Sequence, residues 1–293
     1  MSKLTKFILT FCGITFLLGG ILFGVGQFFG EKSQQNPWFG ENVFGDVDVT
    51  VDGMKIYLGE NAENVECMEK NEILPDFENI HMQAECANVQ IVTGKEFQIS
   101  CTYPENEMPD YKVVNNTLEV IQDKQEDYVN TGNVTRSIII SIPEQAVLKD
   151  VTLENVVGNI SITAINAYSC MTTLTTGNVE ISNSEMESCH VTISTGNIDI
   201  SQLVSEDCGV STSTGEVDIT ASDVKKYVIA NGVGDTFLDL SKVTYDYSMD
   251  VETNVGKVYL DGEEVSKKYE KDRNEECCIK IRKNVGDINI KTK

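Results

Sequence analysis

Basic residues are scarce in this 293-residue chain, which has 23 Lys and Arg against 46 Asp and Glu. Such an acidic protein repels the phosphate backbone of nucleic acids, so a nucleic-acid-binding protein is excluded. The chain also lacks a C-x-x-C pair, the spacing expected of a thiolate metal site. The acidic excess indicates solubility and at most loosely held cations, not a fold or a reaction.

Histidine is almost absent, since His81 and His190 are the only two. His190 follows Cys189, but alternation along a strand sends the two side chains to opposite faces, so a Cys-His nucleophile pair is not expected. The signatures of leucine-rich repeats and of calcium-binding nonapeptide repeats are also missing. We therefore expect no catalytic residues and no cofactor.

Acidic residues are missing from the start of the chain, where the first one is Glu31. The uncharged apolar run from Phe7 to Gly30 is 24 residues long, and roughly 20 helical residues span a bilayer core. Lys3 and Lys6 precede it and would keep the N-terminus in the cytoplasm. The pattern predicts a single-pass protein of the cell membrane, anchored by residues 7–30, with its C-terminal domain extracytoplasmic.

Two other interpretations of this run are less well supported. A cleaved signal peptide would have an apolar region of about 7–15 residues ending at small residues, whereas Phe28 and Phe29 stand at that place. A lipoprotein anchor at Cys12 is disfavoured because the bulky Phe11 precedes it. Gly20 and Gly24 have a GxxxG spacing that can bring two membrane helices together, so a homo-oligomer through the anchor stays open.

The stretch TTGNVEIS at 175–182 returns nineteen residues later as STGNIDIS and again as STGEVDIT. A fixed interval of this size is typical of a stacked repeat architecture. Aligning the chain on the glycine gives four intervals of nineteen residues and two looser copies. We predict structural corners at Gly158, Gly177, Gly196, Gly215, Gly234, Gly256 and Gly286.

Apolar residues alternate with polar ones on both sides of each glycine, which predicts two strands joined by a corner. Glycine suits the corner because it adopts positive φ without steric cost. Such a unit could also be a hairpin in an antiparallel meander. Identical residues recur in columns, however, as in Thr176, Thr195 and Thr214, and as in Asn159, Asn178 and Asn197. Parallel coils place equivalent residues about 4.8 Å apart, so the columns favour an all-β fold, a β-solenoid of stacked nineteen-residue coils after an N-terminal transmembrane helix.

The order of these elements resembles a known bacterial family. A strand with a TGKE turn, the segment ISIPEQAVLKDV and the serial TGNVEIS phrases are similar to the putative adhesin family, a domain of unknown function also called Toastrack. The resemblance runs from about Phe77 to the end of the chain. It implies a β-solenoid ectodomain on a membrane anchor, found in cell-envelope stress and surface proteins, and no catalytic residues. The insertion at 261–278 departs from the pattern and leaves the stacking of the final coil undecided.

These observations divide the chain into three regions. Residues 1–30 are the cytoplasmic start and the transmembrane anchor, and residues 77–293 are the β-solenoid ectodomain. Residues 31–76 are predicted to be a stalk with one or two strands that could cap the first coil, because an uncapped solenoid end exposes strand edges that aggregate.

Two columns could carry chemistry. Cys170, Cys189 and Cys208 recur at the nineteen-residue interval, and we predict buried free thiols because β-carbons near 4.8 Å apart are too distant for a disulfide. Bridges involving Cys67, Cys86, Cys101, Cys277 and Cys278 are left undecided by the sequence.

Glu180, Asp199 and Asp218 form an outward acidic ladder. It is a weak candidate for binding Ca²⁺ or Mg²⁺, and the simpler interpretation is a solvated face that discourages aggregation.

Together these observations predict a non-enzymatic interaction module that binds an envelope or surface protein or a glycan, either adhesin-like or part of envelope-stress signalling. The alternative is a cell-wall polysaccharide hydrolase or lyase, since solenoid enzymes of that class use clustered carboxylates.

Overall fold

The computed structural model describes residues 47–51, 54–58, 67–122, 129–130, 135–243, 245–272 and 276–292. These residues are all-β apart from one short 3-10 turn at Glu105–Glu107. Within these ranges no helix is long and apolar enough to cross a membrane, and the predicted anchor at 7–30 lies outside them.

The predicted repeat unit is a coil of two strands. Each regular coil has an eleven-residue strand, a corner at the predicted glycine and a four-residue strand. The regular coils are β11 (Val147–Val157) with β12 (Ile160–Thr163), β13 (Asn166–Thr176) with β14 (Val179–Ser182), β15 (Glu185–Thr195) with β16 (Ile198–Ser201), β17 (Val204–Thr214) with β18 (Val217–Thr220), and β19 (Asp223–Val233) with β20 (Thr236–Asp239).

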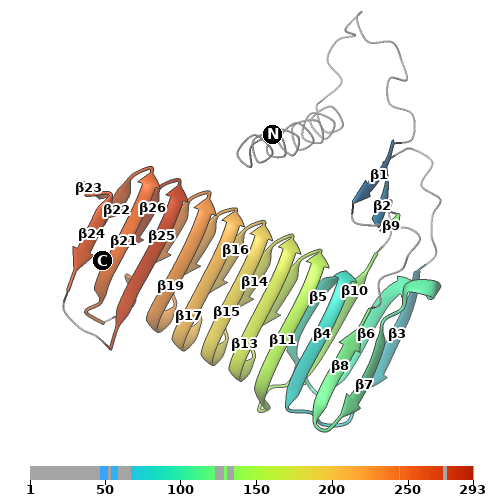
Figure 1. Ribbon diagram of the computed structural model, residues 1–293. Helices are drawn as coiled ribbons and strands as arrows, with labels where there is room; N and C mark the ends of the chain where they lie inside the picture. Colours follow the sequence, from blue (N-terminus) through green and yellow to red (C-terminus); the bar gives the residue numbers. More distant parts are fainter. Residues whose placement is uncertain are drawn as a thin grey trace, which may run out of the picture. The chain divides into compact units, whose positions relative to one another are not determined.

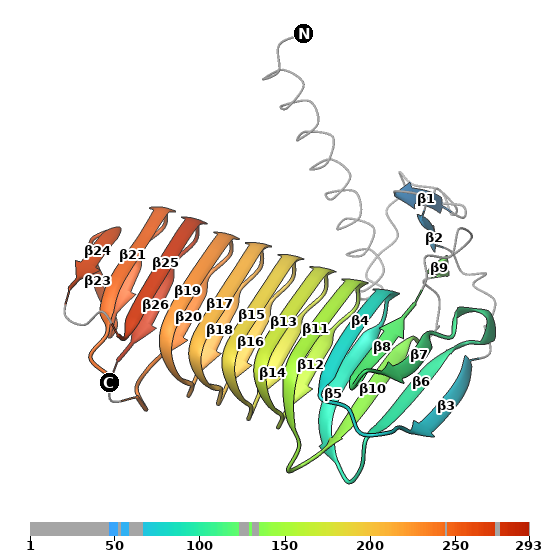
Figure 2. The ribbon, with the colours of Figure 1, turned by 60° about the horizontal axis from the view of Figure 1, so that its bottom comes forward.

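Equivalent strands of successive coils pair in parallel with an offset of nineteen residues, as Cys170 does with Cys189. The long strands belong to a sheet of eleven strands and the short strands to a sheet of twelve. Figures 1 and 2 show the coils stacked along one axis. This parallel stacking confirms the β-solenoid and excludes the meander, in which successive strands would pair antiparallel.

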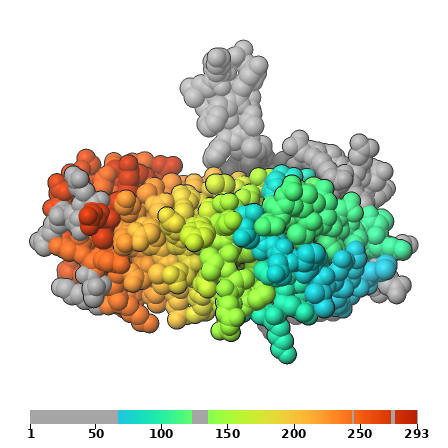
Figure 3. All heavy atoms as spheres, turned by 90° about the horizontal axis from the view of Figure 1, so that it is seen from below, coloured from blue at the N-terminus to red at the C-terminus, as the bar shows by residue number. Residues whose placement is uncertain are grey.

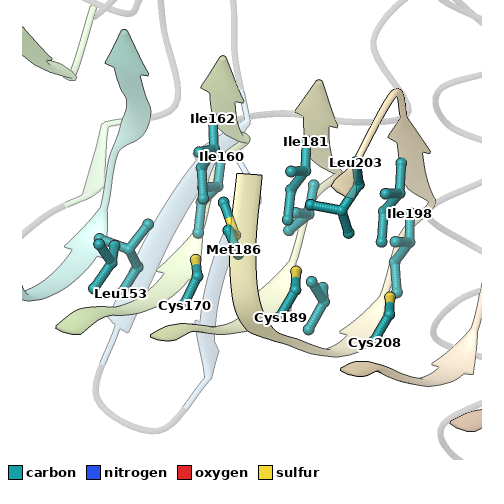
Figure 4. Close-up of a cluster of buried hydrophobic side chains, with 14 of the residues drawn as sticks. Leu153, Ile160, Ile162, Cys170, Ile181, Met186, Cys189, Ile198, Leu203 and Cys208 are labelled. Carbon is teal, nitrogen blue, oxygen red and sulfur yellow. The ribbon is translucent and has the colours of Figure 1, made fainter. Parts of the chain in front are cut away.

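The core lies between the two sheets, because alternation sends every second side chain inward. Ile181 and Ile200 of the short strands are fully buried, and Cys189 of a long strand is too. Figure 4 shows the isoleucines of the short strands close to the cysteines of the long strands. Each coil therefore adds one slice to a continuous core and depends on the slices beside it.

Glycine is required at the corners because the backbones of neighbouring coils approach closely there. Gly196 has φ +138°, and a Cβ on it would lie 1.7 Å from the carbonyl oxygen of Gly177. Gly177 has φ +137° and stands in the same relation to Gly158, at 1.8 Å. All seven predicted corner glycines have positive φ, which confirms them as corners.

The asparagines after the glycines join one coil to the next. Asn159 Oδ1 accepts a hydrogen bond from the backbone N–H of Asn178 at 3.0 Å, and Asn178 Oδ1 accepts one from Asn197 N–H at 2.9 Å. Asn197 Oδ1 continues the series with Glu216 N–H at 2.9 Å. These three positions are asparagine because the side-chain oxygen of each accepts the backbone N–H of the following coil.

A second corner follows β12, β14, β16 and β18 and was not predicted. Its residue has positive φ but is not glycine, as in Asn183 at +50° and Gln202 at +53°. The next residue turns inward, and Ser184 there accepts the backbone N–H of Ile165 at 3.3 Å and donates to Ser182 O at 2.9 Å. The buried hydroxyl is thus satisfied within the corner.

The last two coils stack in the reverse of their chain order. β25 (Cys278–Val285) and β26 (Ile288–Lys291) lie between the coil of β19 and β20 and the coil of β21 (Ser248–Val255) and β22 (Val258–Leu260), as Figure 1 shows for the long strands.

The corner ladder follows this spatial order. Asp235 Oδ1 accepts the N–H of Asp287 at 2.8 Å, and Asp287 Oδ1 accepts the N–H of Lys257 at 2.9 Å. The final coil, which the sequence left undecided, therefore does stack, but inside the array.

The insertion at 261–278 forms the C-terminal end of the stack. β23 (Glu263–Val265) pairs antiparallel with β22, and β24 (Lys268–Lys271) pairs antiparallel with β21. Both strands are short and carry Lys or Glu, which discourages further strands from adding to the edge.

The N-terminal end has a similar reversal. β4 (Asn79–Cys86) and β5 (Asn88–Gly94) pair with β11 and β12 at an offset of 71 residues. The next coil outward comes later in the chain and consists of β8 (Thr117–Ile121) and β10 (Ser137–Pro143). The chain therefore leaves the stack after β5, and β8 and β10 later pair with the outer side of β4 and β5.

Antiparallel strands close this end as well. β6 (Gln98–Pro104) pairs with β10, β3 (Cys67–Ile73) with β6, and β7 (Asp110–Val114) with β8. The predicted cap segment forms β1 (Val47–Val51) and β2 (Met54–Leu58), which pair with each other and with β9 (Val129–Asn130) in a separate sheet. β6 and β7 therefore pair with the outermost N-terminal coil, and β3 covers the outer edge of β6.

We expect Gly196→Ala to destabilise the protein far more than Gly262→Ala. Both residues have positive φ, at +138° and +84°, but a Cβ at Gly262 has nothing within 4 Å. The control should lose about 1–2 kcal/mol of unfolding free energy. The corner variant should lose more, because its Cβ overlaps the backbone of the preceding coil in addition to about 1–3 kcal/mol of conformational strain. Urea unfolding measures both, and equal losses would contradict the proposed role of the close approach.

Candidate functional site

Nine exposed Ser and Thr side chains form a grid on the outer side of the long-strand sheet, next to the glycine corners. We call this grid the hydroxyl face; it comprises Thr173, Thr175, Thr176, Thr192, Ser194, Thr195, Ser211, Ser213 and Thr214. β13, β15 and β17 contribute three residues each. Thr173, Thr192 and Ser211 are in register on adjacent strands, which lie about 4.8 Å apart.

The surroundings of the hydroxyl face are also uncharged on the next coil, where Ala230, Gly232 and Val233 of β19 take the equivalent positions. Charged residues flank this neutral area on both sides along the stack. Glu154 of β11 is in register with Thr173, and Arg282 of β25 is in register with Ala230. Figure 3 shows these coils as adjacent bands in the middle of the molecule. A neutral area of this extent is unusual on a chain with a net charge of −23.

The sequence revealed only one third of this face. The column of Thr176, Thr195 and Thr214 was noted in the sequence as a sign of stacked coils; the structure confirms that its members are in register and shows that they are exposed. The other two columns repeat at the same interval, four and two residues before each glycine. They were missed because Ser replaces Thr within each column, although a hydroxyl is kept throughout.

The acidic ladder lies on the other sheet. Glu180, Asp199 and Asp218 are in register on β14, β16 and β18. Partial burial and the charge of Asp199 raise the pKa of Asp218 above its usual range. Among the described residues, no group of three or more His, Cys, Asp and Glu side chains is arranged to hold a metal ion.

His190 and Cys189 lie on opposite faces, as predicted, since Cys189 is fully buried and about half of the His190 side chain is exposed. His190 instead contacts Ser188, with 3.0 Å between Nδ1 and Oγ, and approaches Asp207, with 3.4 Å between Nε2 and Oδ2. The ring fits there because Gly209 has no side chain; a Cβ would lie 2.5 Å from it.

This Ser-His-Asp cluster has the members of a hydrolytic triad but not the rest of an active site. It lies on the open surface of β15 and β17, whose backbone groups pair with neighbouring strands. An oxyanion needs preorganised donors aimed at it, and strand N–H groups engaged in a ladder do not provide them. The cluster extends the polar surface beside the hydroxyl face.

A cavity of about 200 Å³ lies near the C-terminal end of the stack. Tyr245 and Tyr247 line it, together with the ion pair of Asp246 and Lys271, whose Oδ1 and Nζ atoms are 2.8 Å apart. It includes none of the carboxylates of the acidic ladder.

The three cysteines of the predicted column are buried free thiols in register on β13, β15 and β17. Burial raises the pKa of Cys170, and a hydrogen bond with Cys208 together with burial raises that of Cys189. Burial also raises the pKa of Cys101, to about 12. These thiols pack as small apolar groups and do not act as nucleophiles.

A two-sheet parallel solenoid with glycine corners and capped ends defines the class of this protein. The chain belongs to the Toastrack DUF4097 family, whose model matches residues 77–291. Among curated proteins, none matches the chain significantly.

Solved structures of bacterial proteins are similar to this chain at low sequence identity. A putative cell adhesion protein from Clostridium sporogenes is 18% identical, with a TM-score of 0.36 and coverage of 78% of this chain and 100% of that one. A putative adhesin from Bacteroides fragilis is 15% identical, with a TM-score of 0.45 and coverage of 77% and 97%. A putative lipid binding protein from Parabacteroides distasonis is 13% identical, with a TM-score of 0.44 and coverage of 78% and 97%.

The buried thiols should make stability fall as pH rises. A thiol with a raised pKa keeps its proton in the folded state, while the unfolded chain releases it above about pH 8.5, so alkaline pH favours unfolding. We expect Cys189→Ala to reduce this loss by up to about 1.4 kcal/mol per pH unit between about pH 9 and 11. Urea unfolding at several pH values measures the slope, with Cys278→Ala as the half-buried control.

An unchanged slope in Cys189→Ala would contradict the assignment. So would mass mapping that finds the column bridged, or alkylated without denaturant.

Proposed function

We propose that this chain is a membrane-anchored, extracytoplasmic interaction module without enzymatic activity, adhesin-like or part of envelope-stress signalling. The observation that carries the proposal is the hydroxyl face, an uncharged grid on a chain with 46 acidic residues. Its partner is an envelope or surface protein or a glycan that presents uncharged hydrogen-bonding groups.

Hydroxyl groups suit such a surface because each one can donate and accept a hydrogen bond. They also cost far less to remove from water than carboxylates, and charged residues are depleted in the centres of protein interfaces. Met171 and Val228 add exposed apolar area at the edge, 52% and 47% exposed. The acidic remainder of the surface repels anionic polymers, so the charge pattern also supports selectivity for neutral partners.

The anchor forms the second part of the proposal. Residues 7–30 cross the membrane once, and Lys3 and Lys6 hold the N-terminus in the cytoplasm. The acidic domain then faces outward, and the GxxxG spacings of the anchor permit a homo-oligomer.

A polysaccharide hydrolase or lyase is the weaker candidate. Its carboxylates would be Glu180, Asp199 and Asp218, but Glu180 and Asp199 are exposed on the outer side of a sheet. Enzymes close water out of the reacting site, and an open strand surface offers no such enclosure.

We expect Thr192→Glu to abolish most binding of the full chain to isolated cell envelopes, because it places an unpaired carboxylate in the centre of the hydroxyl face. Gln90→Glu adds the same charge on the exposed side of the other sheet and serves as the matched control. Co-sedimentation should show a loss of about tenfold or more for the first variant and none for the second. Equal binding of both variants, or no binding by the parent, would overturn the proposal.

External protease should remove the acidic domain from intact cells and leave an N-terminal fragment in the membrane. Mass mapping of that fragment and of the released domain locates the cleavage between residues 31 and 66. Full protection in intact cells, with cleavage only after lysis, would contradict the orientation.

A further inference from the structure

Lys283 is buried in the core, only 3% exposed, on the coil that stacks out of order. Its neighbour in register on β19 is Asn231, which is 2% exposed. The two side chains occupy equivalent positions on adjacent parallel strands, about 4.8 Å apart. The stem of Lys283 passes the corner at Gly286, where a Cβ would lie 2.6 Å from Cε.

Thr236 connects the two side chains. Its Oγ1 accepts hydrogen bonds from Lys283 Nζ at 3.0 Å and from Asn231 Nδ2 at 3.3 Å, and the residue is fully buried. Asn231 Nδ2 also donates to Gly215 O and Asp235 O, at 3.1 and 3.3 Å. Asn231 Oδ1, in contrast, is buried without a hydrogen-bond partner among the described residues.

Burial makes the amine of Lys283 easier to deprotonate. It lowers the pKa of Lys283 to about 8, although the carboxylates of Asp235, Asp287 and Glu216 act in the opposite direction. A desolvated lysine with a lowered pKa is an activated nucleophile, because a larger fraction is neutral at physiological pH. A buried ammonium that stays charged costs free energy, which its conversion to a neutral amide would remove.

We propose that Lys283 and Asn231 form an intramolecular isopeptide bond that links β25 to β19. The lone pair of neutral Lys283 Nζ attacks Asn231 Cγ and forms the C–N bond. The bond from Cγ to Nδ2 breaks, and Nδ2 leaves as ammonia. The hydroxyl of Thr236, within hydrogen-bond distance of both nitrogens, passes the proton from Nζ to Nδ2. One amine and one primary amide give one secondary amide and one ammonia, so no oxidant or cofactor is needed.

The position of this link gives it a structural purpose. β25 belongs to the last coil of the chain, yet it is inserted between β19 and β21. The bond would close a loop between residues 231 and 283, which are 52 positions apart, and would hold the inserted coil in place. A covalent loop closure disfavours the unfolded chain, and a longer loop disfavours it more.

Tryptic peptide mapping of the purified full-length chain tests the proposal. We expect a branched peptide that joins the segments containing Asn231 and Lys283, with no cleavage after Lys283 and an intact mass lower by one ammonia. Linear peptides alone would overturn the proposal. Intact mass is not sufficient, because Asn231 precedes Gly232 and a succinimide at that site also loses ammonia.

Variants of Lys283 and Thr236 distinguish a covalent bond from a non-covalent contact. Lys283→Arg keeps a buried cation but should give no branched peptide, whereas a succinimide would persist in it. Thr236→Val should slow formation of the branched peptide after synthesis of the chain in a cell-free system by about a hundredfold, and Thr236→Ser should restore it. If Thr236→Val is as fast as the parent while circular dichroism shows it folded, the proton-relay role is wrong. If Lys283→Arg fails to fold, the Thr236 pair still decides the question.

Discussion

The structure depends on the close approach of backbones at the glycine corners. Each corner carbonyl lies where a side chain at the next corner would begin, and a Cβ on Gly196 would stand only 1.7 Å from the oxygen of Gly177. This contact allows one register only, because a shift by one residue would place a side chain against the carbonyl. The asparagine ladder then holds the same register through hydrogen bonds of 2.9–3.0 Å. With the corner set, alternation decides which side chains are buried along both strands.

In-register stacking turns a repeated residue into a continuous surface. A cysteine at one inward position becomes a buried column of three thiols, and a hydroxyl at three outward positions becomes a grid of nine. The same rule places carboxylates side by side on the other sheet, where Asp199 raises the pKa of Asp218. Like charges in neighbouring coils repel each other, so an acidic protein of this architecture must leave some columns neutral. The hydroxyl face lies on such neutral columns, and the absence of charge there is what the proposed binding role requires.

Much of the regular array could be predicted from the sequence, because glycine, asparagine and apolar residues recur at one interval. The corners, the alternation and the buried cysteines all followed from it. The second corner could not be found this way, since Ala164, Asn183, Gln202 and Ala221 share a positive φ but no residue type. The order of the terminal coils was also hidden, because pairing at offsets of 52 and 71 residues leaves no periodic signal. The larger part of the hydroxyl face was missed because Ser replaces Thr at some positions of two columns, so that their residues are not identical.

The reversed coils at both ends solve the problem that a solenoid has no natural stopping point. A coil at the end of a stack pairs on one side only, and a chain terminus placed there would fray. Here the terminal segment β25 to β26 pairs on both sides, and the outermost positions are occupied by the short antiparallel strands β23 and β24. Loss of the C-terminal coil would leave β21 and β22 without the parallel partners β25 and β26. The last strand of the chain is therefore among the least able to detach, and it is there that Lys283 meets Asn231 and Thr236 in the core.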